Sequence, residues 1–393
     1  MDVFLGEWVN LLLRWAHLVV AIGWIGTSFY FVALDYSLSR EDSGKPGLFG
    51  GAWQVHGGGF YHVEKYAVAP PHLPPRLHWF QWEAYLTWIT GLGLMVSQYY
   101  MHAATYLIDP AVMVMTPLQA GMISLASLFV GWVIYDVLCR LLAGHALLLA
   151  AGVFALILAA SMFYTNVYSG RGAFVHAGAF IGTIMAFNVF AVIIPNQRKL
   201  VAQLVRGEVP EARYGLIGKQ RSLHNNYLTL PVLAIMLSPH YPFLWTHPQN
   251  WLIVTLILVS GGLFRHVLNR FDAGDDWNKY GWLAPVAIFV LFCAIYLTAP
   301  VNKGARGAAA ASDAEILAIS ARHCTSCHAR KPTHQSFPEP PKNVTLETID
   351  DFRRFAPLVL SQAVHNKAMP VGNQTVMTDV ERETLGQWIR GQR

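Results

Sequence analysis

Eight long apolar runs constrain the fold of this chain more than any other feature of its sequence. Each is close to the roughly 20 residues that an α-helix needs to cross the hydrocarbon core of a bilayer. Only 13% of the residues are charged and 54% are hydrophobic, whereas about a quarter of a soluble domain is charged. We therefore expect an all-α fold, a polytopic transmembrane bundle of about eight helices. The expected spans are Trp8–Leu34, Trp79–Tyr100, Pro117–Arg140, His145–Asn166, Ala173–Pro195, Ser222–Ser238, Asn250–Arg270 and Lys279–Ala299.

A haem-attachment motif follows the last apolar run. Cys324 and Cys327 are separated by two residues, and His328 comes directly after them. This spacing is typical of c-type haem: the two thiols bond covalently to the porphyrin and the histidine becomes the proximal iron ligand. Met369, which precedes a proline, lies at a spacing suited to the second axial ligand. We expect haem c in a class I-like cytochrome c domain at 313–393, joined by an Ala/Gly-rich linker at 302–312 to a membrane domain at 1–301.

Basic residues in the loops predict the orientation. Arg171 is the only Lys or Arg in the loops after the second, fourth and sixth runs, whereas the loops after the first, third, fifth and seventh runs are basic. Cytoplasmic loops carry the excess of Lys and Arg, and c-type haem is attached on the periplasmic side. We therefore expect a bacterial inner-membrane protein with both termini in the periplasm. No basic stripe lies outside these loops, which argues against nucleic-acid binding.

Ionisable residues inside the apolar runs are the candidates for a membrane active site, because such residues are costly in a bilayer and mark functional interiors. We select His17, Glu83, His176 and Asn225 from a longer polar set that also includes Arg14, Asp136, His145, His224, Asn226, Arg265 and His266. Two interpretations stay open, and both could hold. One is a membrane haem b with His17 and His176 as iron ligands; the other is a substrate cavity in which these groups bind and deprotonate a polar heterocycle. The arginines could pair with an anionic substrate or simply extend toward the interface.

Two weaker patterns complete the membrane domain. His17 and His176 each stand five residues before an Ile-Gly pair, which would fit a duplicated 4+4 bundle. The segment from Trp53 to His62 is rich in glycine, aromatic residues and histidine, and could be a lid or a flexible connection.

Several segments resemble bacterial membrane-bound, cytochrome c-linked urate oxidases of the PuuD type. They are RWAHLVVAIGWIGTSFYF, GGAWQVHGGGFYHVEKY, LHWFQWEAYLTWITG, GRGAFVHAGAFIGTIMAFNVFAVIIPNQR and RSLHNNYLTLPV, followed by the CxxCH domain. The resemblance implies an oxidoreductase of purine catabolism that converts urate to 5-hydroxyisourate. We expect water to supply the oxygen, and electrons to pass through haem c to a soluble cytochrome c or terminal oxidase, because an attached cytochrome would have no role if oxygen took them directly. The resemblance assigns Cys324, Cys327, His328 and Met369 to the haem and assigns no catalytic residue in the membrane.

Two other functions fit the same sequence. One is a respiratory electron-transfer subunit without a small-molecule substrate, such as a quinol–cytochrome adaptor. The other is a transporter fused to a cytochrome. Haem reduction that depends on urate would distinguish the enzyme from both.

Overall fold

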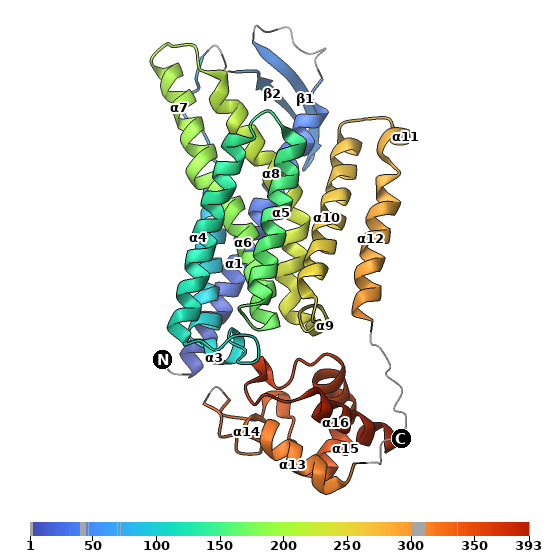
Figure 1. The fold of residues 1–393 in the computed structure, drawn as a ribbon. Helices are drawn as coiled ribbons and strands as arrows, with labels where there is room; N and C mark the ends of the chain where they lie inside the picture. Colours follow the sequence, from blue (N-terminus) through green and yellow to red (C-terminus); the bar gives the residue numbers. More distant parts are fainter. Residues whose placement is uncertain are drawn as a thin grey trace.

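The computed structural model describes residues 3–39, 45, 47–68, 70, 72–299, 311–335 and 337–392. Most of the linker expected at 302–312 therefore lies outside the described residues. The described chain forms a long helical bundle and a smaller helical region at the C-terminus (Figure 1). The N-terminus and the C-terminal region lie at one end of the bundle, and the first interhelical loop lies at the other (Figure 1).

Six helices in the described part of the chain are long and apolar enough to cross a membrane. The third and fourth expected spans form α4 (Pro117–Leu141) and α5 (Ala146–Thr165). Thr116 caps α4 with a reciprocal capping box, and Pro117 begins the helix where its missing N–H costs nothing. The other four are α1 (Val3–Ser37), a continuous rod of α6 (Gly170–Phe187), η2 (Asn188–Ile193) and α7 (Ile194–Val205), α10 (Asn250–Asp272), and α11 (Trp277–Tyr280) with α12 (Leu283–Thr298).

The two remaining expected spans are helical but are not among these six. They are α2 (Trp82–Leu94), continued by the π-helical turn η1 (Met95–Tyr100), and α8 (Ala212–Leu237). Both carry polar residues that lower their mean hydropathy, and in α8 these are buried, as at Arg221, Asn225 and Asn226. A helix that hides polar side chains inside a bundle does not need an apolar sequence throughout. Short helices α3 (Ala103–Tyr106), η3 (Ser238–His240) and α9 (Pro242–Trp245) lie in the loops.

The expectation of a purely helical chain is wrong for the first long loop. Strands β1 (Leu48–His56) and β2 (Gly59–Tyr66) pair as an antiparallel hairpin. Gly57 and Gly58 form its two-residue turn with φ of +58° and +80°, the conformation that a tight hairpin requires and that glycine adopts readily. The segment considered a lid or a flexible connection is therefore a regular hairpin.

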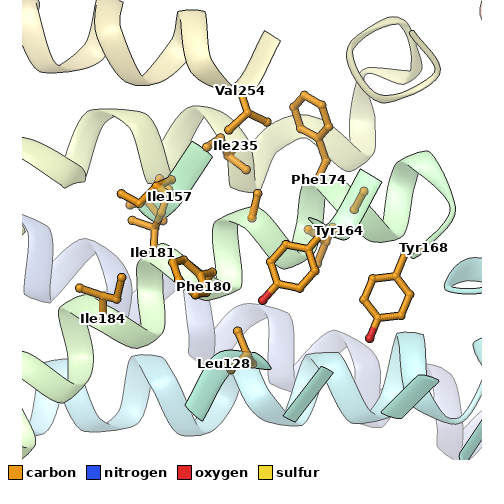
Figure 2. Close-up of a cluster of buried hydrophobic side chains, with 14 of the residues drawn as sticks. Leu128, Ile157, Tyr164, Tyr168, Phe174, Phe180, Ile181, Ile184, Ile235 and Val254 are labelled. Carbon is orange, nitrogen blue, oxygen red and sulfur yellow. The ribbon is translucent and has the colours of Figure 1, made fainter. Parts of the chain in front are cut away.

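Helix α6 is the centre of the bundle. Most of its residues are buried, and it packs with α4, α5, α8 and α10 in one hydrophobic core. Figure 2 shows part of this core, with Phe174, Phe180 and Ile181 of α6 among side chains from α4, α5, α8 and α10. Aromatic side chains at one end of this core, including Tyr164 and Tyr168, carry hydroxyl groups into it (Figure 2).

The C-terminal region has its own core. Its helices are α13 (Asp313–His323), α14 (Thr325–His328), η4 (Pro341–Asn343), α15 (Ile349–Val359) with η5 (Leu360–His365), η6 (Val371–Asn373) and α16 (Asp379–Gly391). Phe352, Leu385 and Trp388 are fully or almost fully buried between α13, α15 and α16. An independent core of this kind is what a separately folding unit needs.

Candidate functional site

His17 and Glu83 lie at the interface of α1 and α2. His17 Nδ1 is 3.0 Å from the Thr87 carbonyl oxygen and 3.0 Å from Thr90 Oγ1. The Glu83 Cγ lies 3.7 Å from where a side chain on Gly23 would begin, so its stem packs against the bare backbone of α1. Within the described chain, the Glu83 carboxylate has no hydrogen-bond or ion-pair partner. Of the four selected residues, Glu83 has the carboxylate that is free to accept a proton.

His176 is fully buried on α6 and has partners at both ring nitrogens. Its Nε2 is 2.7 Å from Ser124 Oγ, and its Nδ1 is 2.7 Å from the Gly172 carbonyl oxygen. The ring of Tyr168 lies 4.4 Å away, centroid to centroid. His17 and His176 thus have separate sets of partners, and in the described chain neither is among the other's contacts.

Asn225 belongs to a third group of polar side chains, between α4, η2 and α8. Its Oδ1 accepts a hydrogen bond from Asn188 Nδ2 at 2.9 Å, and its Nδ2 donates to the Met185 carbonyl at 3.0 Å. Asn188 Nδ2 also donates to the Tyr135 hydroxyl, which lies 2.7 Å from His224 Nδ1. The oxygen and the nitrogen of the Asn225 amide are therefore both used in bonds to other helices.

The same helix turn holds a buried ion pair. Arg221 is 2% exposed and its Nη2 is 2.7 Å from Asp136 Oδ1. Asp136 Oδ2 also pairs with Arg140 at 2.7 Å, one turn further along α4. This carboxylate neutralises a guanidinium that would otherwise be buried without a counter-ion.

A neighbouring face of α8 carries a second buried polar group, formed with α1 and α10. Its members are Asn226, Arg265 and Asn269, which are between 0% and 3% exposed. Asn269 Nδ2 donates to Asn226 Oδ1 at 2.8 Å, and the Arg265 guanidinium lies 4.1 Å from the centroid of the Phe29 ring. The sequence pointed to Asn226 and Arg265 but missed Asn269; its spacing of four residues from Arg265 was the available signal.

The CxxCH motif lies at the start of the C-terminal region. Helix α14 presents Cys327 and His328, and Cys324 is its N-terminal flanking residue. His328 Nδ1 is 2.8 Å from the Val344 carbonyl oxygen, which leaves Nε2 free for a metal. Cys324 and Met369 both pack against the core of the C-terminal region. The buried guanidinium of Arg382 donates to the carbonyl oxygen of Met369 and fixes that loop.

The loop after Met369 contacts the bundle. Gln374 Nε2 donates to the Ala104 carbonyl oxygen at 2.6 Å. Gly372 has φ of +63°, and a Cβ there would lie 2.7 Å from the Thr105 carbonyl oxygen. Helix α3 is in turn bound to α6, because Ser169 donates to the Tyr106 carbonyl and Leu107 accepts from the Ser169 N–H. The Met369 side of the C-terminal region therefore faces the end of the bundle that contains His176.

Comparison with known proteins identifies the bundle. No curated protein and no solved structure is significantly similar to the chain. The family model described as urate oxidase N-terminal matches residues 3–299, which include every helix of the bundle and well over half of the chain. The protein therefore belongs to the urate oxidase N-terminal family.

Proposed function

We propose that the protein is a membrane-bound urate oxidase that passes electrons through its own haem c. The observation that carries this proposal is the union, in one chain, of the urate oxidase family region with a haem-attachment motif in a region that contacts it. The reaction would convert urate and water to 5-hydroxyisourate, two protons and two electrons. A carrier of single electrons would accept these two in succession.

The membrane bundle would bind urate and take up its protons. Urate is an anion at neutral pH, so a basic group must hold it and a proton acceptor must lie near it. Glu83 is the acceptor that we favour, because its carboxylate is without a partner in the described chain. His17 is a second candidate: Nδ1 is its bonded nitrogen and Nε2 could carry the exchanged proton.

Four residues would hold the haem. Cys324 and Cys327 would attach it through their thiols, and His328 and Met369 would hold its iron. When bound, this group supplies a one-electron acceptor whose potential is raised by His/Met ligation. The bond from His328 to Val344 orients the imidazole, and Arg382 holds Met369 in place. A membrane haem b between His17 and His176 has less support, because both ring nitrogens of His176 already have protein partners.

The arrangement of the two ends of the bundle supports a location at the bacterial inner membrane. The N-terminus and the C-terminal region lie at one end of the bundle, and the hairpin and α7 lie at the other, as the distribution of basic loops requires (Figure 1). With haem attachment in the periplasm, both termini would be periplasmic. Electrons would then leave to a soluble cytochrome c or a terminal oxidase.

An anaerobic mixing experiment tests this function. Purified, oxidised holoprotein is mixed with urate, and the c-type absorption bands are followed together with the urate band. We expect haem reduction and urate loss in a ratio of two haems per urate. If dithionite reduces the haem and urate does not, the urate assignment fails, and a respiratory electron-transfer subunit becomes the better interpretation. Urate uptake into vesicles without turnover would instead indicate a transporter.

A further inference from the structure

The face of α10 that points toward α1 and α8 holds a buried cation without an ion-pair partner in the described chain. Arg265 is 3% exposed, and neither its Nε nor its Nη2 has a hydrogen-bond partner. Within the described chain, no carboxylate lies within ion-pair distance of it. These two nitrogens form one edge of the guanidinium, the edge that makes two parallel hydrogen bonds to a planar acceptor. This edge of the Arg265 guanidinium is therefore buried in the bundle without a hydrogen-bond acceptor in the described chain.

Two amides beside Arg265 are each half satisfied. The bond from Asn269 to Asn226 uses one atom of each side chain, and it leaves Asn226 Nδ2 and Asn269 Oδ1 buried without a partner. Asn269 follows Arg265 by one helical turn, so the free atoms belong to one surface of α10 and α8. Together they offer three N–H donor groups and one acceptor. Buried polar groups are nearly always hydrogen-bonded, so these four atoms on one surface leave hydrogen bonds for water or a polar ligand to make.

The other buried arginine of the bundle shows what Arg265 lacks. Arg221 is equally buried and its Nε and Nη1 also lack partners in the described chain, but Asp136 accepts from its Nη2 at 2.7 Å. The two sites share α8 and differ in ion pairing. Asp136 pairs directly with Arg221, whereas Asp272, the carboxylate that acts on Arg265 electrostatically, lies beyond ion-pair distance. Arg265 instead lies over the Phe29 ring, which stabilises a cation only partly. The missing partner at Arg265 is therefore an anion.

We propose that Arg265, Asn226 and Asn269 form the binding site for the purine anion. Arg265 would bind a deprotonated ring nitrogen and the carbonyl oxygen beside it, through Nε and Nη2. Asn226 would donate to another carbonyl oxygen, and Asn269 would accept from a ring N–H. This proposal rests on the proposed function, since it names the groups that recognise its substrate.

The position of the site suits the proposed chemistry. Arg265 packs on Phe29, and Glu83 packs against Gly23 of the same helix. Six residues of α-helix rise about 9 Å and turn through about 600°, so the two groups contact different faces of one short stretch of α1. Among the six apolar helices α1 is the least buried within the bundle, and its displacement would therefore open the site with the smallest loss of packing.

A pair of buried arginines supplies the test. Arg265→Gln removes the charge and the fork, Arg265→Lys keeps the charge alone, and Arg221→Gln is the matched control. Each holoprotein is examined for urate turnover and for the rise in melting temperature that urate produces, which does not depend on the haem. Two lost hydrogen bonds to a charged group correspond to roughly a hundredfold or greater rise in KM. We expect this rise in KM for Arg265→Gln, and we expect urate not to raise the melting temperature of that variant. Arg265→Lys should recover the parent KM only in part.

Stability separates a binding role from a structural one. Without urate, Arg265→Gln should melt at the same temperature as the parent protein or higher, because it removes a buried charge that has no counter-ion. Arg221→Gln should melt lower, since it removes the buried partner of Asp136 and leaves it only the exposed Arg140, while its KM stays within about threefold of the parent value. An Arg265→Gln protein that melts lower, or that keeps the parent KM, overturns the proposal. A parent protein that neither oxidises urate nor is stabilised by it overturns the proposed function itself.

Discussion

A single added methyl group, at Gly372, should weaken the contact between the C-terminal region and the bundle. In Gly372→Ala the new methyl group would lie 2.7 Å from the Thr105 carbonyl oxygen and 3.2 Å from that of Ile108. Both atoms belong to the backbone of the bundle and cannot rotate away. Overpacking of this kind costs about 1–3 kcal/mol, which corresponds to roughly a 5- to 150-fold loss in the docking equilibrium.

The same substitution has a second effect that must be kept apart from the first. Gly372 has φ of +63°, a conformation that costs a residue with a Cβ about 1–2 kcal/mol. This strain exists whether or not the region is docked, so it lowers the stability of the C-terminal region and leaves docking unchanged. Gln374→Ala is the strain-free comparison: across the contact it removes the 2.6 Å bond to the Ala104 carbonyl, and inside the C-terminal region it removes a 3.1 Å bond to His334 Nε2. One such bond is worth about 0.5–1.5 kcal/mol, or roughly a two- to tenfold loss in docking.

The assay is disulfide formation between Ala104→Cys and Gln374→Cys, whose parent residues are in contact. We expect Gly372→Ala to slow cross-linking in that background by at least about fivefold. In proteins without the cysteine pair, it should slow haem reduction by urate, and Gln374→Ala should slow it less. Reduction by dithionite should be unchanged in both, which excludes damage to the haem. Equal cross-linking rates with and without Gly372→Ala would refute the docking arrangement.

Three further predictions concern single residues. Asp136→Ala should destabilise the bundle by about 3–5 kcal/mol, because it leaves Arg221 buried and unpaired. Adding Arg221→Met to this variant should restore most of the lost stability. Thermal unfolding in detergent measures both variants, and equal melting temperatures of the single and double variants would contradict the prediction. Met369→Ala should lower the midpoint potential of the haem while leaving it covalently attached, as a redox titration of the c-type bands would show; an unchanged potential would exclude Met369 as a ligand. Hydrogen bonds from the N–H and hydroxyl of Thr378 lower the pKa of Glu381 to about 2. The stability that Glu381 contributes should therefore be complete above about pH 4.5 and disappear toward pH 2, and acid unfolding of Glu381→Gln should lack this step.

Covalent and compositional features could be read directly from the sequence. Helix length and hydropathy are local properties, so all eight apolar runs were predicted as helices, and six of these helices are apolar enough to cross a membrane. The haem motif is also local, because Cys324, Cys327 and His328 are neighbours in the chain. The hairpin was missed because its Gly57–Gly58 turn lies in a segment whose glycines suggested flexibility, although two glycines are also what a tight turn requires.

The state of each polar side chain was decided only by the tertiary structure. The sequence places Arg221 in the basic loop before the sixth apolar run and Arg265 inside the seventh, yet both are buried; Asp136 from α4 pairs with Arg221, and no carboxylate in the described chain forms an ion pair with Arg265. The sequence makes His176 and Glu83 equal candidates for the membrane site. In the structure, His176 is hydrogen-bonded at both ring nitrogens, whereas the Glu83 carboxylate lacks a partner in the described residues. Hydrogen bonds and ion pairs act over about 3 Å between residues that are tens of positions apart in the chain. Sequence therefore determines which polar groups enter the membrane, and packing determines which of them remain free to bind a substrate.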